Sequence, residues 1–265
     1  MKKALKITFI AVFWVGVWYL LSFCHALYFE LDLSNNFLFP YPHQVIKKLF
    51  SLLDEKTYYL VTIYSLIRIS FSTVIAVISG FLTAMLASKF SFLNDLIKPF
   101  LSTIKAVPVT VFVFILYIIF FRYKAMTSMI ITFLIVYPIV FTNIYQGIKS
   151  INTDLKEVCA VYKIPFKKRL RALYLPSIMP YFVSALTTTI GLAWKAGIAA
   201  EAICPPENSM GFYILNAKSY IDNDELFAWA LTLVIINIIL ELLFKKLINA
   251  AFKKWLPNEV KHENS

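Results

Sequence analysis

Three basic side chains stand inside long apolar runs of this sequence, and they are its sharpest chemical feature. Arg68, Lys105 and Lys195 each lie in a stretch that otherwise carries almost no charge. A charge at the centre of a bilayer costs at least about 2.5–3.5 kcal/mol, so such residues usually face protein or water. They could form a positive wall along a path for an anionic solute. They could also be structural, paired with a carboxylate such as Glu201 or, for Lys105, extended toward the inner membrane surface.

The residues needed for an enzyme's active site are not brought together by any pattern in the sequence. The three cysteines and three histidines are scattered, without the spacing of a disulfide framework or a metal site. There is no Ser/His/Asp set and no phosphate-binding glycine loop, which a chain with six glycines could hardly build. We therefore expect no catalytic residue, no metal and no cofactor, and any energy from ATP must come from another polypeptide.

The elements that position these charges are apolar runs long enough to cross a membrane. The chain has 265 residues, of which 60% are hydrophobic and 15% charged, whereas a soluble domain has about 45–50% and about 25%. Each of six runs has the roughly 17 residues that a helix needs to cross the hydrocarbon. They cover about residues 7–27, 60–88, 99–121, 125–148, 177–204 and 226–244. The sequence thus predicts an all-α polytopic membrane protein, with six transmembrane helices in a single domain over residues 1–265.

The distribution of Lys and Arg predicts the orientation of this domain in the lipid bilayer. With the N-terminus inside, the inner segments hold 17 of the 26 basic residues, the outer segments hold six, and three lie in spans. This bias places both termini and the segment 149–176 in the cytoplasm. The net charge of +11 is therefore spread along the cytoplasmic membrane edge, and we expect no nucleic-acid partner.

The segment 154–180 is a basic, amphipathic stretch between two apolar runs. Apolar residues such as Val158, Ile164 and Leu173 alternate there with basic ones. This pattern is typical of short helices that lie on a membrane surface or pack against a partner. An ordinary loop, or an anchor that recruits cytosolic proteins, is the alternative.

The same segment resembles the "EAA" loop of the permeases of ABC importers. Glu157-Val158-Cys159-Ala160, Lys163 and Leu173-Tyr174-Leu175-Pro176 follow that layout, with Cys159 in place of an alanine and Lys163 in place of the usual glycine. Leu192-Ala193-Trp194-Lys195-Ala196-Gly197 is similar to the signature of the family's fifth span. The resemblance covers about residues 38–248 and is strongest toward the nitrate, sulfonate, taurine and bicarbonate permeases.

This resemblance implies a cell-membrane (plasma or inner membrane) subunit that works as a pair, here as a homodimer with a second copy of the chain. A cytoplasmic ABC ATPase dimer would drive it, and an extracytoplasmic solute-binding protein would deliver the solute. The segment 149–176 would be a cytoplasmic coupling-helix loop that docks on the ATPase. If the turn at Lys163 needs a positive φ, this chain must adopt that conformation without the glycine that the family uses there. The coupling residues would be Glu157, Ala160, Lys163, Ile164, Phe166, Leu175 and Pro176.

The resemblance and the charges together predict import of a small solute by alternating access. The basic residues favour an anion such as a sulfonate or nitrate, with Arg68, Lys105, Lys195 and Glu201 along the pathway. A permease for a thiamine-precursor pyrimidine is the alternative. A stand-alone channel, a secondary carrier or a membrane enzyme is a further one, although a secondary carrier usually shows internal repeats and buried acidic residues.

Overall fold

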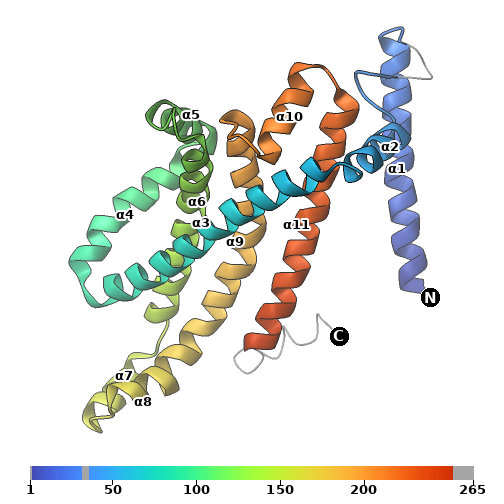
Figure 1. Cartoon of the computed structure of the whole chain (residues 1–265). Coiled ribbons are helices and arrows are strands. Elements are labelled where there is room, and N and C mark those ends of the chain that lie inside the picture. The colour runs from blue at the N-terminus through green and yellow to red at the C-terminus, as the bar shows by residue number, and fades with distance from the viewer. Residues whose placement is uncertain (1, 32–35, 253–265) are drawn as a thin grey trace.

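The computed structural model describes residues 2–31 and 36–252, and every regular element within them is a helix. Lys253, Lys254 and Lys261, three of the 17 basic residues of the inner segments, lie outside the described residues. The helices, shown in Figure 1, are α1 (Lys2–Tyr28), α2 (Pro42–Leu53), α3 (Lys56–Lys89), α4 (Ser91–Ala106), α5 (Val109–Ile119), α6 (Lys124–Lys149), α7 (Thr153–Val161), α8 (Phe166–Arg169), the π-helix η1 (Leu170–Tyr174), α9 (Leu175–Ile203), α10 (Met210–Ser219) and α11 (Asn223–Phe252).

The prediction of an all-α, membrane-spanning fold is confirmed. Within the described part of the chain, five helices (α1, α3, α6, α11 and the stretch that ends with α9) are long and apolar enough to cross a membrane. The pair α4 and α5 makes a sixth if the two are counted as one span. Helix α6 is the central helix, because it packs on α3 and on α9 and half of its most apolar window is buried, against 11% for α1.

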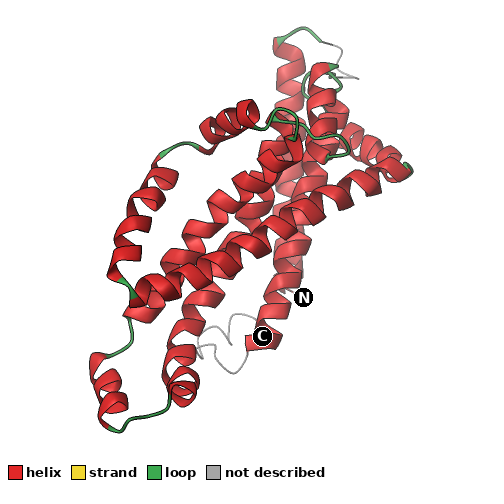
Figure 2. Cartoon of the chain, turned by 60° about the vertical axis from the view of Figure 1, so that its left-hand side comes forward, coloured by secondary structure: helices red, strands yellow, loops and turns green. Residues whose placement is uncertain are grey.

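The run 99–121 differs from the single straight helix that its length predicts. It is broken after Ala106, and α5 turns away from α4 by 104°, a bend that Figure 2 shows as an arch away from the bundle. Pro108 explains the break, since the residue before a proline is pushed into the extended region and Val107 has φ −87° and ψ 132°. Pro138 causes no such break in α6, because membrane helices tolerate proline where neighbouring helices support the backbone.

Helix α1 stands at the edge of the bundle and is held near its C-terminal end. The indole of Trp18 donates a hydrogen bond to the carbonyl of Pro40 (3.1 Å), and the hydroxyl of Ser22 donates to the same carbonyl (3.2 Å). The amide of Asn36 in turn donates to the backbone oxygen of Ser22 (2.8 Å). Most large side chains of α1 are exposed, as expected of a helix that faces lipid.

An ion pair fastens α2 to the start of α11. The ammonium of Lys48 lies 2.8 Å from Asp222 and 3.1 Å from Glu225, with side chains of Lys48 and Asp222 that are 30% and 39% exposed. Burial by itself would raise the pKa of Asp222, but the hydrogen bond from Lys48 and the backbone N–H of Glu225 outweigh it and lower that pKa. Burial lowers the pKa of Lys48, but the hydrogen bonds to Asp222 and Glu225 outweigh it and raise that pKa.

These shifts predict a pH window for the stability that this clamp contributes. Because the pKa of Asp222 is lower in the folded protein, its contribution is present above the unfolded value of about 3.9 and is lost as the pH falls through the folded value. The contribution of Lys48 is present below about 10.4 and is lost as the pH rises through its raised value. Asp222→Asn should flatten the acid limb of a thermal-stability profile by at most about 1 kcal/mol, since the pair is partly exposed. An unchanged acid limb would show that the ion pair contributes nothing.

Candidate functional site

Helices α7 and α8 form a projecting tip at one end of the bundle, the end at which α1 begins and α11 ends (Figure 1). Asn152 caps α7, because its side-chain oxygen accepts a hydrogen bond from the backbone N–H of Asp154 (2.8 Å). Four large apolar side chains are exposed at this tip, and they are Leu155, Val158, Val161 and Tyr162. Exposed apolar clusters of this kind mark protein or membrane contacts.

The predicted coupling residues occupy this tip and the entry to α9. Glu157 and Ala160 are exposed on α7, Ile164 is half-buried in the turn, and Leu175 and Pro176 are the half-buried first residues of α9. Phe166 begins α8, and its side chain lies outside the described ones. The structure therefore brings these residues into one segment, whereas their role in coupling stays a prediction.

The turn after α7 has the left-handed conformation that the family's glycine would suit. Lys163 has φ 50°, and its N–H donates to the carbonyl of Ala160 (3.1 Å) while the N–H of Ile164 donates to that of Cys159 (3.0 Å). These two bonds make the Schellman motif that ends many helices. The sequence thus keeps the turn and places a lysine in a conformation that costs a non-glycine residue roughly 1–2 kcal/mol.

Replacing this lysine should change the strength of the turn in a predictable direction. Lys163→Gly should favour the turn by about 1 kcal/mol, which slows hydrogen exchange of the Ile164 amide about fivefold. Lys163→Val should speed that exchange, because a β-branched residue is poorly tolerated at positive φ. Equal exchange in the two variants would contradict the left-handed turn.

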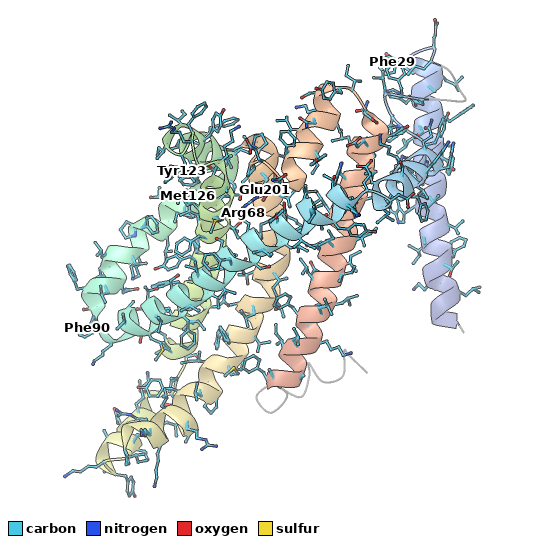
Figure 3. The ribbon with its side chains drawn as sticks, viewed as in Figure 1. Phe29, Arg68, Phe90, Tyr123, Met126 and Glu201 are labelled. Atoms are coloured by element: carbon cyan, nitrogen blue, oxygen red, sulfur yellow. The ribbon has the colours of Figure 1, made fainter. Side chains whose placement is uncertain are left out.

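Arg68 and Glu201 form a buried ion pair between α3 and α9 (Figure 3). The guanidinium donates to one carboxylate oxygen of Glu201, and the hydroxyl of Ser65 donates to the other (2.7 Å). Glu201 is 0% exposed and the side chain of Arg68 is 14% exposed. Both charges are thus satisfied within the protein, and this is the structural pairing between helices that the sequence left open.

The first turn of α10 completes the surroundings of Glu201. The N–H of Met210 donates to the hydroxyl of Ser65 (3.1 Å), and the N–H of Gly211 donates to the carboxylate. A Cβ at Gly211 would lie 2.2 Å from the backbone carbonyl carbon of Glu201, so only glycine allows this approach. Because a helix N-terminus carries partial positive charge, the arrangement ties α3, α9 and α10 together around one carboxylate.

Lys105 lies at the end of α4, next to the break before α5. Its ammonium donates to the hydroxyl of Thr142 on α6 (3.2 Å), and its side chain is exposed. Since α4 begins at Ser91, Lys105 is about 21 Å along the helix at 1.5 Å per residue.

Lys195 differs from the other two intramembrane cations. It is exposed on α9, and the structure gives its ammonium no hydrogen-bond or ion-pair partner among the described residues. It lies beside a cavity of about 410 Å³ between α9, α10 and α11. Of the three cations, Lys195 is the one for which the described residues supply no polar partner.

Sequence reasoning missed several residues that build these sites. Ser65 and Gly211 complete the surroundings of Glu201. Ser65 is 136 residues away from it in sequence, and both residues are ordinary in type. Leu155 and Tyr162 extend the apolar surface of α7. Their period of three to four residues along the helix is the signal that could have found them.

Comparison with known proteins agrees with the resemblance of the loop and the fifth span. Residues 60–253, most of the chain, match the family model described as "Binding-protein-dependent transport system inner membrane component". The bicarbonate transport system permease protein CmpB of Synechococcus elongatus is 30% identical over 156 residues, which cover 59% of this chain and 56% of that protein. The nitrate import permease protein NrtB of Synechococcus elongatus is 27% identical, over 58% of this chain and 54% of that protein.

A further relative aligns over a longer range at lower identity. The formylaminopyrimidine transport permease protein ThiX of Halalkalibacterium halodurans is 22% identical over 217 residues, 82% of this chain and 86% of that protein. The chain spans about half the length of the bicarbonate and nitrate relatives. With a helical, multi-pass membrane fold and a family match over most of its length, the chain belongs to the binding-protein-dependent transport system inner membrane component family, the permeases of ABC importers.

Proposed function

We propose that this chain is the membrane-spanning subunit of an ATP-driven importer that moves a small solute into the cytoplasm. One transmembrane domain covers residues 1–265, and two cytoplasmic ATPases hydrolyse the ATP. The observation that carries the proposal is the apolar surface of α7, made by Leu155, Val158, Val161 and Tyr162 at the projecting tip. An amphipathic helix of this kind can lie in a hydrophobic groove of a partner.

The connection from this tip to the membrane suits a mechanical role. Helix α8 and η1 run without a break into α9, so a displacement of the tip would reach the fifth predicted span directly. Closure of two ATPases on ATP binding would then move the spans as rigid bodies and alternate access between the two sides. Glu157, Ala160, Lys163, Ile164, Phe166, Leu175 and Pro176 are the proposed coupling residues.

The proposed orientation has both termini and the segment 149–176 in the cytoplasm of a cell-membrane protein. The positions of the first and last helices support this orientation, because α1 begins and α11 ends at the same end of the bundle as α7 (Figure 1). The opposite end, with α2 and α10, would receive a solute-binding protein. A second copy of the chain would complete the pathway.

The proposed solute is a small anion such as a sulfonate or nitrate. The ammonium of Lys195, which has no partner among the residues that the structure describes, supports it. A cation without a partner at membrane depth is expected to face water or a ligand. Lys105, Arg68 and Glu201 are the further pathway residues in this proposal. Because Arg68 and Glu201 satisfy each other, their contribution would be to hold the pathway helices in place.

A pyrimidine permease is the second candidate, and one observation favours it. The relative named for formylaminopyrimidine transport aligns over 82% of this chain, a longer range than the bicarbonate and nitrate relatives. A stand-alone channel or secondary carrier fits less well, because it would have no use for an apolar surface on α7.

Affinity purification of the tagged chain from its native membrane tests the proposal. We expect an ABC ATPase to co-purify in a ratio of one ATPase to one permease chain, with ATP hydrolysis in the complex and none in the chain alone. A chain that purifies without any ATPase, and still moves solute in vesicles, would support the stand-alone alternative instead.

A further inference from the structure

A cavity of about 410 Å³ lies between α9, α10 and α11. This volume is within the range of about 300–1,000 Å³ that small-molecule sites occupy. Its lining is apolar apart from two residues, Lys195 on α9 and Asn237 on α11. The remaining lining residues are Trp194, Ile198, Ala199, Ala202, Ile214, Leu233, Val234 and Ile238.

The wall of this cavity is held in a fixed position. The indole N–H of Trp194 donates to the carbonyl of Leu233 (3.2 Å), so the ring is fixed between α9 and α11, and Trp194 is 2% exposed. Ala199 and Ala202 leave space on α9 where larger side chains would fill it. The neighbouring cavity of about 190 Å³, which Trp194 also lines, contains no charged residue in its lining.

The polar groups next to the cavity favour a ligand with one negative charge over a ligand with two. The amide N–H of Asn237 donates to the carboxylate of Glu241 (2.8 Å). That carboxylate can approach α9 because position 191 is glycine. A Cβ at this position would lie 2.5 Å from an oxygen of the Glu241 carboxylate. Gly191 is one turn from Lys195 on the same helix. Asn237, which lines the cavity, thus connects it to the Glu241 carboxylate, which lines a smaller space next to it. A second anionic group would be repelled there.

We propose that this cavity is the solute site of the permease and selects a singly charged organic anion with a small apolar body. This inference rests on the proposed function and narrows its solute class. The headgroup would pair with the ammonium of Lys195, and the apolar body would lie against Trp194, Ile198 and Val234. A hydrated inorganic anion would lose water on entering such a lining and would gain no apolar contact in return.

A series of ligands with growing apolar bodies tests this assignment. Burial of one CH₂ group contributes about 0.8 kcal/mol, so affinity should rise about fourfold with each added carbon. The purified full-length chain in lipid nanodiscs is titrated with methane-, ethane-, propane- and butanesulfonate, and with nitrate and bicarbonate. Quenching or shift of tryptophan fluorescence reports binding, and Trp194→Phe verifies that the signal comes from the cavity.

Two variants of the lining and one matched control sharpen the result. Lys195→Met should weaken every sulfonate at least tenfold, while Lys195→Arg keeps the charge and should bind. Ala199→Leu fills the cavity and should remove the dependence on chain length. Ser70→Leu fills the neighbouring cavity instead. It should change neither the affinity for sulfonates nor its dependence on chain length.

Three outcomes would overturn the inference. Nitrate or bicarbonate could bind as tightly as butanesulfonate. A neutral hydroxymethylpyrimidine could bind with the same affinity to the wild-type chain and to Lys195→Met. Alternatively, sulfonate binding could appear only in zwitterionic nanodiscs and vanish with anionic phospholipid, which would identify a lipid headgroup as the occupant. The assay needs neither the ATPase nor uptake, so a permease that co-purifies with an ATPase but binds no sulfonate refutes this site alone.

Discussion

Arg68→Met should be among the most destabilising single substitutions in this protein, at about 3–5 kcal/mol of unfolding free energy. The substitution leaves the carboxylate of Glu201, which is 0% exposed, without its cation, and an uncompensated buried charge costs that much. Glu201→Gln should cost less, because Arg68 remains 14% exposed and keeps some contact with water. Unfolding of the purified chain in SDS, followed by circular dichroism, measures both.

The double variant Arg68→Met/Glu201→Gln separates pairing from simple loss of side chains. Glutamine can still accept hydrogen bonds from Ser65 and Gly211, and no charge remains buried. We expect the double variant to be more stable than Arg68→Met alone, with a coupling energy of about 2 kcal/mol or more. Lys195→Met, the same change at an exposed cation, is the control and should cost less than about 1 kcal/mol. Additive effects of the two single changes would contradict the ion pair.

Val158→Asp should abolish coupled transport while leaving the chain folded. Val158 is 47% exposed on α7, so a charge there costs the isolated chain little, but it would be buried without a partner in an apolar groove. We expect ATP-driven uptake to fall at least tenfold and the ATPase to be lost on purification. The thermal stability of the chain itself should not change.

Thr153→Asp is the matched control for this change. It adds the same charge to the same helix, but in the first turn, where the helix dipole favours an acidic residue, and away from the apolar residues. Uptake should stay near the wild-type rate. If both variants transport equally well, α7 is not the docking helix.

The membrane-spanning segments could be predicted because run length and composition are local properties of the sequence. Helices α3, α6, α9 and α11 cover the predicted runs and extend beyond several of them. The run 99–121 could not be predicted as a bent pair, since a count of apolar residues carries no direction. The bend depends on Pro108, whereas Pro138 leaves α6 unbroken where α3 and α9 pack against it.

The candidate sites were predictable as residue types but not as pairs. The sequence names Arg68, Lys195 and Glu201 as unusual, and it leaves open which cation the carboxylate takes. The packing of α3 against α9 makes that choice, because it brings Arg68 and Ser65 of α3 to the carboxylate of Glu201. Similarly, the sequence raised a positive φ at Lys163 only as a condition, because a lysine does not by itself indicate that conformation. In the structure two backbone hydrogen bonds accompany it.

ATP-driven uptake by the reconstituted complex of this chain, its co-purified ATPase and its solute-binding protein measures the coupling role of α7 directly. Proteoliposomes are loaded with ATP on the ATPase side, and uptake of a radiolabelled small organic anion is followed with the wild-type chain and with Val158→Asp. We expect uptake that requires ATP and the binding protein and that is lost in the variant. Uptake at the same rate without ATP, or in the variant, would contradict this role.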